Sequence, residues 1–505
     1  MTKSHRQYDL CVLGCGPAGF AGATAALDAG RRVCIVEPGE IGGAGVMWGA
    51  LASKTMWELA KDYYVATRSN RGYHIGQVQV DYTEVRQSVF QAVREKQAQM
   101  KSQIKAYTSP CWNGPGALSW KPGRGAFLSP HAIQIRYADG RQETIIADQV
   151  LIAVGSKPRH LPDVPMVRDR VFDSDTILKL KQFPRRLMIV GAGIIGCEYA
   201  TIFANYGRTR VDLIDHKEHV VPYEDEDLSI FVGNALGRKG VTIHHSAKIR
   251  KCTPRDQGLA AVLESAQGPP RTLRPDAALV AVGRCPDLTA LDLEQAGIMA
   301  NAHGYLTVDG HCRVRDHIYA AGDVTRHPAL VNIAEAQARH AVNHMFHQAA
   351  APLEIQNMST VMFFHPPVAA VGLNEKNCRK QNIPHRVAVY ANSLLSRAIA
   401  MRSTAGFVKI IISDDAEQRI LGMRAAGPQA SSTIMAIALL MDQKKGLGDI
   451  IHSLYPHPTM TEGIQECLRV LSGQSIYKPH AFPGQIQIRT WQPGDPAPDA
   501  CYLTG

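Results

Sequence analysis

The sequence predicts an α/β protein with two Rossmann-like domains and a C-terminal α+β domain. The pattern of strand, glycine-rich turn, helix, strand and terminal acid occurs twice, with its first glycine at position 14 and again at position 191. From about residue 351 the pattern changes to short strands followed by an apolar helix. A chain of 505 residues is long enough to form several domains.

The first glycine-rich turn follows an apolar strand at residues 8–14 and reads GCGPAG. In such a unit Gly14 makes the tight turn, Gly16 lets the backbone approach a pyrophosphate, and Gly19 lets the next helix pack on the strand. The N-terminus of that helix directs N–H groups and its dipole at the phosphates. The second strand ends at Glu37, which we expect to accept a hydrogen bond from a ribose 2′-hydroxyl.

The second unit repeats every part of this pattern. Its turn reads GAGIIG, with Gly191, Gly193 and Gly196 in the three glycine positions, and its second strand ends at Asp215. Because both copies keep the three glycines and the acid, the sequence favours two bound dinucleotides over one site and one decayed copy.

Two further strands, at residues 148–155 and 277–286, each contain a Val-Gly pair where we expect the chain to cross between domains. The glycines of these pairs, Gly155 and Gly283, are candidate nucleotide-binding residues. A helix is expected at 85–105, with core packing and a solvated outer face as its whole role. The predicted organisation is a first domain of residues 1–155 and 285–350, a second of 156–284, a third of 351–476, and an extended Pro- and Gln-rich tail of 477–505.

The charge pattern argues against a nucleic-acid partner. A formal net charge of +10 comes from 55 Lys and Arg against 45 Asp and Glu, but no basic run of five or more residues occurs. Dispersed positive charge of this size instead favours a general attraction to anionic ligands such as dinucleotides.

Several features predict a cytoplasmic protein without a membrane span. The N-terminus enters a strand almost at once and shows no hydrophobic leader. No run approaches the roughly 18 apolar residues that cross a bilayer. The 11 cysteines lack CxxC or zinc-ligand spacing, which predicts reduced thiols and no metal site.

Five segments occur in order along the chain: GCGPAG, GGAGVMWGALASK, GAGIIGCE, YAAGDV and YPHPTMTEG. On these segments the chain resembles the pyridine nucleotide–disulfide oxidoreductase family over about residues 1–475. Within that family it is most similar to the soluble pyridine nucleotide transhydrogenases, which share GxMWG and stretches like GCEYATIF, and it is also similar to dihydrolipoamide dehydrogenase.

The resemblance implies that the first unit binds FAD, that the second binds NAD(P)H, and that the third domain forms a homodimer. Gly43 belongs to the FAD site, and Gly322 with Asp323 resembles its second contact, where the carboxylate accepts a hydrogen bond from the ribityl chain. The alternative for this pair is a simple turn that closes a strand. Lys54 matches the lysine near flavin N5 and Glu198 its carboxylate partner, where a cation stabilises charge on the reduced ring. The alternative for Lys54 and Glu198 is a surface ion pair on two helices.

This sequence departs from the family at the redox-active disulfide. Most members have Cys-x4-Cys before a Ser-Lys pair, and here those positions are Gly45 and Ala50. No dithiol can therefore accept electrons from the flavin, which excludes disulfide, lipoamide and mercuric reductase chemistry in its usual form. Cys11 and Cys15 lie in the first strand and turn and do not replace the pair. A lone tail cysteine, Cys501, cannot close a dithiol by itself.

Without that disulfide, three functions remain open. In the leading one, reduced flavin passes its hydride to a second nicotinamide in a ping-pong transhydrogenase or diaphorase cycle, which needs a single nucleotide site. In the second, a quinone, metal ion or dioxygen accepts electrons at the opposite flavin face, lined by Met47, Trp48 and Leu51. The third is a non-catalytic flavoprotein that acts as a redox sensor or scaffold.

His457 and Glu462 match the acid–base pair that the family brings in from the partner subunit. With no thiol to serve, the histidine is either a relic packed at the dimer interface or a proton donor to a reduced acceptor.

The acid at the end of the second unit bears on which dinucleotide binds there. Asp215 favours NAD because a carboxylate repels a 2′-phosphate. His216 and Lys217, which follow it, tolerate that phosphate, so NADP(H) remains possible.

Overall fold

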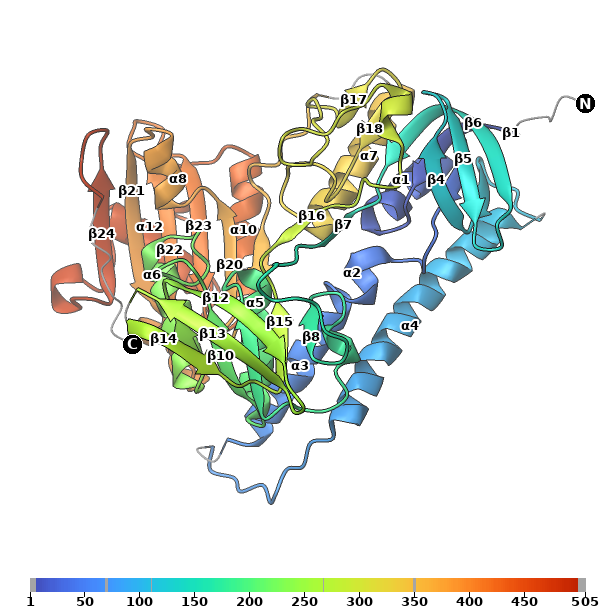
Figure 1. The fold of residues 1–505 in the computed structure, drawn as a ribbon. Coiled ribbons are helices and arrows are strands. Elements are labelled where there is room, and N and C mark those ends of the chain that lie inside the picture. The colour runs from blue at the N-terminus through green and yellow to red at the C-terminus, as the bar shows by residue number, and fades with distance from the viewer. Residues whose placement is uncertain (1–5, 69–70, 110, 267, 348–350, 498–505) are drawn as a thin grey trace, which may run out of the picture.

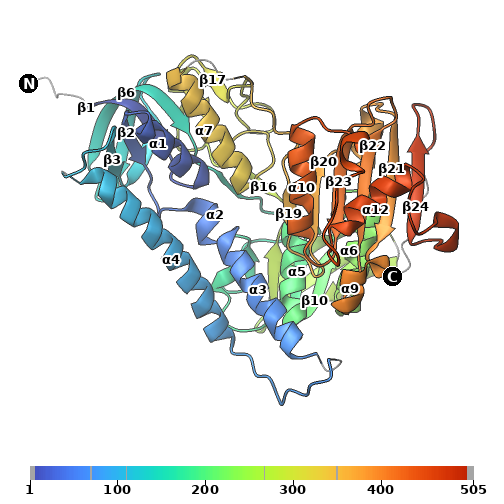
Figure 2. The same ribbon diagram turned by 180° about the vertical axis from the view of Figure 1, so that it is seen from behind.

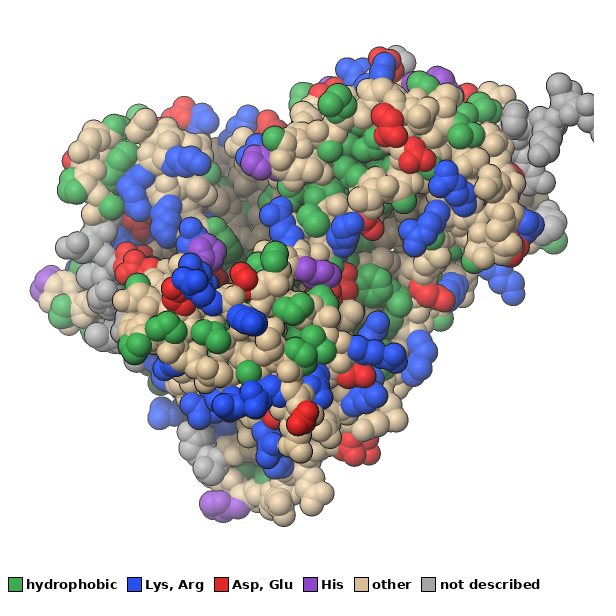
Figure 3. All heavy atoms as spheres, viewed as in Figure 1, with side chains coloured by type: hydrophobic (Ala, Val, Ile, Leu, Met, Phe, Trp, Pro, Cys, Tyr) green, Lys and Arg blue, Asp and Glu red, His purple; other side chains and the backbone are tan. Residues whose placement is uncertain are grey.

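The computed structural model describes residues 6–68, 71–109, 111–266, 268–347 and 351–497. Its strands form three large sheets, and helices pack against them (Figure 1). None of the helices in this part of the chain combines the length and apolarity that a bilayer crossing needs. Lys and Arg side chains occur in separate groups on the face drawn in Figure 3, with Asp and Glu among them.

The first sheet has the strand order β17-β18-β6-β1-β2-β3. Its centre is parallel and almost wholly apolar, with Leu10 and Val12 of β1 fully buried. Helices α1 and α7 lie side by side on one face (Figure 2). The bounds are β1 Arg6–Leu13, α1 Pro17–Asp28, β2 Arg32–Val36, β3 Ala117–Lys121, β4 Gly123–Phe127, β5 Ala132–Tyr137, β6 Gln142–Ile152, β17 Arg313–Arg315, β18 Ile318–Ala320 and α7 Val331–His347.

The second sheet, of order β11-β10-β9-β15-β8, is parallel throughout. A separate antiparallel sheet, β12-β13-β14, extends from it. The bounds are β8 Val171–Asp173, β9 Arg186–Val190, α5 Ile194–Tyr206, β10 Arg210–Ile214, α6 Glu226–Arg238, β11 Thr242–His244, β12 Ala247–Pro254, β13 Leu259–Ser265, β14 Gly268–Leu273 and β15 Ala277–Val280.

Two short strands link the first and second sheets. β7 (Ser156–Pro158) leaves the first sheet after β6, and β16 (Arg284–Pro286) returns after β15. They pair with each other in antiparallel fashion. The two crossings therefore run side by side, each next to one of the Val-Gly pairs singled out in the sequence.

Two long helices, α3 (Leu51–Ala66) and α4 (Tyr82–Thr108), pack against each other beside the sheets. A short helix, α2 (Gly43–Met47), precedes them. The expected helix at 85–105 is confirmed as α4, whose apolar stripe is buried at Val89, Val93 and Met100. It begins three residues earlier because Asp81 caps it by accepting a hydrogen bond from the backbone N–H of Thr83 at 2.6 Å.

The third sheet is antiparallel and has the order β19-β20-β23-β22-β21-β24. Helices α10 and α12 pack on it (Figure 2). The bounds are β19 Thr360–Met362, β20 Val368–Gly372, α8 Glu375–Lys380, β21 His385–Ala391, α9 Ser396–Ala400, β22 Phe407–Ser413, β23 Ile420–Ala426, α10 Ala430–Asp442, α11 Leu447–Ile450, α12 Glu462–Leu471 and β24 Ile486–Trp491.

The predicted tail of 477–505 contains β24, which pairs with β21 as an edge strand. Its end residues Ile486 and Trp491 are buried, so this part of the tail belongs to the third sheet. Pro and Gln around the strand hid it in the sequence, because those residues are typical of irregular segments.

Candidate active site

The two glycine-rich turns have the same backbone geometry. Gly14 and Gly191 adopt φ of 101° and 104°, a left-handed region that favours glycine. Gly16 and Gly193 cap their helices with identical angles, φ −75° and ψ −169°. The predicted equivalence of the two units is therefore present in the structure.

The first and third glycines of each turn contact each other closely. A Cβ atom on Gly19 would overlap the carbonyl oxygen of Gly14, and one on Gly196 would overlap that of Gly191. The helix in each unit thus begins directly against its own turn, which directs the helix N-terminus at the space where a pyrophosphate binds.

The acid at the end of each second strand is bonded to its turn. Glu37 accepts hydrogen bonds from the backbone N–H groups of Cys15 at 2.7 Å and Gly39 at 2.8 Å. Asp215 accepts them from Ala192 at 2.6 Å and Lys217 at 2.8 Å. Both carboxylates lie beside their turns and hold them in shape, and their contact with a ribose stays a prediction.

The surroundings of the two turns differ. A Cβ atom on Gly43 of α2, which has φ +50°, would lie 2.9 Å from the Cα atom of Gly16. A Cβ atom on Gly16 would lie 3.8 Å from the Cα atom of Gly43, whereas one on the equivalent Gly193 would meet no described atom within 4 Å. The first turn is therefore covered by α2 and suits a permanently held cofactor, whereas the second is open and suits a ligand that exchanges.

Lys54 and Glu198 form an ion pair with 2.8 Å between Nζ and Oε2. The lysine side chain, on α3, is 29% exposed, and the glutamate side chain, on α5, is 6% exposed. The other carboxylate oxygen, Oε1, accepts the backbone N–H of Phe363 at 3.0 Å, just after β19. Because the glutamate is buried and bonded to the third domain, the alternative of a surface ion pair does not apply.

Gly322 and Asp323 belong to a polar chain between the first two sheets. Asp323 Oδ2 accepts the hydroxyl of Ser156 at 2.5 Å, and the Ser156 oxygen accepts Arg284 Nε at 2.8 Å. Arg284 Nη1 also donates to Asp175 Oδ1 at 2.5 Å. Gly322 adopts φ +79°, and its N–H donates to a buried glutamine side chain. Because the Asp323 carboxylate is bonded to Ser156 of another strand, the alternative of a simple turn that closes a strand does not account for it.

Sequence reasoning missed Ser156 and Arg284. They lie on the two crossing strands β7 and β16, next to the candidate glycines Gly155 and Gly283, which adopt φ of 73° and 101°. The Val-Gly pairs were the available signal, since the residue after each glycine is the one that enters the polar chain.

At Gly45, one of the two positions without cysteine, a side chain would meet its neighbours closely. A Cβ atom on Gly45 would overlap the Pro17 ring and lie 3.3 Å from a methyl group of Val331. The ten cysteines in the described residues are all free, and burial raises the pKa of the Cys15 thiol. Cys501 lies outside the described residues.

His457 and Glu462 are brought together at the start of α12, with 2.7 Å between Nδ1 and Oε1. The second carboxylate oxygen of Glu462 accepts the backbone N–H of Thr459 at 2.8 Å. The histidine side chain is 66% exposed. Within the described part of one chain no contact joins this pair to Lys54 or Glu198.

The residues expected to line the opposite flavin face are Met47, Trp48 and Leu51. All three are half-buried and pack against the apolar core. Gln97 of α4 approaches Met47, with 2.9 Å between Nε2 and Sδ. In the described residues no group of three or more His, Cys, Asp or Glu is arranged to hold a metal ion.

Two family models match the chain. One, described as pyridine nucleotide-disulphide oxidoreductase, matches residues 8–338, and the other, described as the dimerisation domain of the same family, matches residues 358–468.

Individual proteins are similar over nearly their whole length. A soluble pyridine nucleotide transhydrogenase from Azotobacter vinelandii is 31% identical over 461 residues, which are 90% of this chain and 96% of the relative. A dihydrolipoyl dehydrogenase from Zymomonas mobilis is 27% identical over 93% of this chain and 99% of its own. The crystal structure of LpdA from Mycobacterium tuberculosis superposes with a TM-score of 0.83 at 26% identity, covering 92% of this chain and 99% of that one. These similarities confirm the fold class and the resemblance found in the sequence.

Proposed function

Because the chain belongs to the pyridine nucleotide-disulphide oxidoreductase family, we propose that it is an FAD-dependent enzyme that transfers hydride between nicotinamide dinucleotides. This is the activity of a transhydrogenase or diaphorase, and several relatives are named soluble pyridine nucleotide transhydrogenase.

One observation supports this proposal above the others: the Lys54–Glu198 pair is intact where the sulfur pair is missing. The machinery for accepting hydride is retained, and the usual exit for electrons through a dithiol is closed. A nicotinamide that enters after the first has left is the simplest remaining acceptor.

The residues present fit the two ligands. Bound FAD supplies the two-electron chemistry. The covered first turn and Glu37 bind its adenosine diphosphate, and Asp323 binds its ribityl chain. The open second turn and Asp215 bind NAD(H), while Lys217 makes NADP(H) possible.

Lys54 and Glu198 act together on the charge that develops during hydride transfer. Lys54 presents a fixed cation to the ring that receives the hydride. Glu198 keeps that cation in place, because a lysine that is mostly withdrawn from water needs an anion beside it. The ring of Phe363 also faces the cation, with its centroid 5.1 Å from Nζ.

We assign residues 1–155 and 285–350 to the FAD domain, 156–284 to the NAD(P) domain, and the rest to the dimerisation domain with β24 included. The matched dimerisation model supports a homodimer. The exposed His457–Glu462 pair then lies at or near the partner subunit, as a relic or as a proton donor. A cytoplasmic location is part of the same proposal and is supported by the free cysteines.

The test is an anaerobic titration of the purified protein with NADH, followed by a panel of acceptors. We expect two-electron bleaching of FAD without a thiolate–flavin band, and then rapid reoxidation by thio-NAD. Reoxidation by quinones or metal ions alone would instead establish a quinone or metal-ion reductase. Absence of bleaching would indicate a non-catalytic sensor or scaffold. No observation in the structure favours either alternative over hydride transfer.

A further inference from the structure

The strand β24 is firmly attached to the edge of the dimerisation sheet. It pairs with β21 from Ile486 opposite Tyr390 to Trp491 opposite His385. The Trp491 ring also stacks on the His385 ring with 5.4 Å between centroids. This strand lies beyond residues 358–468, where the dimerisation model matches. It is therefore an addition to the edge of the sheet that the family shares.

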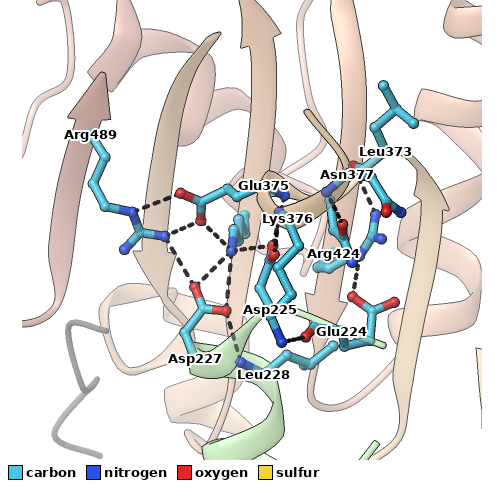
Figure 4. Close-up of polar contacts among 12 residues, drawn as sticks. Glu224, Asp225, Asp227, Leu228, Leu373, Glu375, Lys376, Asn377, Arg424 and Arg489 are labelled. Carbon is cyan, nitrogen blue, oxygen red and sulfur yellow. Dashed lines mark hydrogen bonds and ion pairs between the residues drawn. The ribbon is translucent and has the colours of Figure 1, made fainter. Parts of the chain in front are cut away.

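One side chain of β24 enters a buried cluster of charges (Figure 4). Arg489 Nη2 binds Glu375 Oε1 at 2.5 Å and Asp227 Oδ2 at 3.1 Å. Lys409, whose side chain is fully buried, binds Asp225 and Asp227 at 2.8 Å each and Glu375 at 2.5 Å. Three buried carboxylates thus face two cations at 2.5–3.1 Å, one of which the tail supplies. A third, Arg379, lies farther away, with 4.0 Å between Nη1 and Glu375 Oε2.

The cluster joins the nucleotide-binding and dimerisation domains. Asp225 and Asp227 stand at the start of α6 in the second Rossmann-like unit, whereas Glu375 and Lys409 belong to α8 and β22. Without Arg489, three carboxylates would face Lys409, with Arg379 at 4.0 Å from Glu375 Oε2 as the next cation, in a region with little water to screen their repulsion. The start of α6 is the part of the second unit on which that repulsion would act.

A short series of hydrogen bonds leads from α6 to the second glycine turn. Ser229 of α6 donates its hydroxyl to the carbonyl oxygen of Val221 at 3.3 Å. The N–H of Val221 donates to the carbonyl oxygen of Ala192 at 2.8 Å. Ala192 lies between the first two glycines of the turn, and its N–H donates to Asp215. The start of α6 and the adenosine side of the dinucleotide site are therefore held in one bonded unit.

We propose that residues 485–492 form a strap and that Arg489 is a positioning residue for the second dinucleotide site. The strap fixes α6 against the dimerisation domain, and α6 holds Val221, which bonds to Ala192 of the turn that Asp215 also holds. Arg489 would act through α6 and not by contact with a ligand. This inference rests on the proposed function, because it takes the second turn as the site of the nicotinamide dinucleotide.

The test compares full-length Arg489→Met and Arg489→Lys with the matched control Thr490→Met. Thr490 is exposed on the same strand and points to the opposite face. Binding of NAD⁺ is measured by titration calorimetry, alongside FAD content and steady-state kinetics with NADH. For Arg489→Met we expect the Kd for NAD⁺ and the KM for NADH to rise about two- to thirtyfold, with kcat and FAD content nearly unchanged. Arg489→Lys should recover most of the affinity, and Thr490→Met should match the wild type.

The outcomes separate this proposal from the proposed function. An Arg489→Met protein with a lower Tm but an unchanged Kd for NAD⁺ would show a purely structural strap and overturn the proposal. Where Arg489→Met does not fold, Arg489→Lys decides the matter: the proposal requires a smaller but measurable rise in Kd, and an unchanged value contradicts it. A wild-type protein that binds no NAD⁺ would overturn both proposals.

Discussion

Two lysines in this protein, Lys54 and Lys409, each bind carboxylates across a domain boundary, but their surroundings differ. Lys409 is fully buried and meets three carboxylates and a neighbouring arginine. Lys54 is 29% exposed and meets one carboxylate. A lysine that is fully enclosed by opposite charge can act only on the fold. Lys54 keeps part of its surface open, so its charge is available to a ligand.

The buried charges around Lys409 shift one another's pKa values. Although burial by itself lowers a lysine pKa, the surrounding Asp227, Glu375 and Asp225 raise that of Lys409 above its ordinary value. In return, and against the effect of burial, Lys409 lowers the pKa of Asp225 and of Asp227. Asp225, Asp227 and Lys409 are therefore charged at neutral pH.

The largest expected effect is on stability, from Lys409→Met. This change leaves three buried carboxylates with Arg489 as their main cation, and breaking a buried ion pair costs about 3–5 kcal/mol. The free energy of unfolding, measured by chemical denaturation of the FAD-loaded dimer, should fall by that amount. A loss below about 1 kcal/mol would show that the cluster is not structural.

Lys54→Met should instead slow the reduction of the flavin by NADH. The change removes the fixed cation beside the ring that accepts hydride, and loss of one such group slows reactions by about 100-fold or more. Stopped-flow measurement of flavin reduction by NADH should show this, with FAD still bound and Tm close to wild type. An unchanged reduction rate would remove Lys54 from the mechanism.

Strong acid should weaken the Lys409 cluster. The pKa values of Asp225 and Asp227 lie below the ordinary value of 3.8 in the folded protein, so the unfolded chain takes up protons at a higher pH. Their contribution to stability is complete above about pH 4 and is lost as the pH falls through the lowered values. Unfolding followed between about pH 5 and pH 2 should show this loss, and Lys409→Met should show a smaller dependence. If the free energy of unfolding depended on pH equally in the wild type and in Lys409→Met, the lowered pKa values could not be attributed to Lys409.

The smallest effect is expected from Lys61→Met, a control on the same helix as Lys54. Lys61 pairs with Glu58 at 2.8 Å, and both side chains are largely exposed, at 38% and 53%. Pairs of this kind contribute about 0–1 kcal/mol. Tm and the rate of flavin reduction should both stay near wild type. A large change in Tm or in the rate of flavin reduction would show that Lys61 has a role that its exposure does not reveal.

Local patterns in the sequence were enough to predict the two glycine turns and the helix α4. Short-range sterics determine these elements: only glycine tolerates the left-handed angles and close contacts at Gly14, Gly19, Gly191 and Gly196. Residue identity at positions 45 and 50 likewise excludes a dithiol without any knowledge of the fold. The pairing of Lys54 with Glu198, 144 positions apart, was reached only through resemblance to a family.

The sequence by itself thus determined the nucleotide units and the absence of a sulfur pair, because both follow from residues close together in the chain. The tertiary structure alone decided that Ser156 links Asp323 to Arg284, that β24 completes a sheet, and that Arg489 enters a buried cluster. Those contacts join segments from distant parts of the chain. The reason is physical: a buried charge is tolerated only where the fold brings an opposite charge to it, and no local pattern records where that will be.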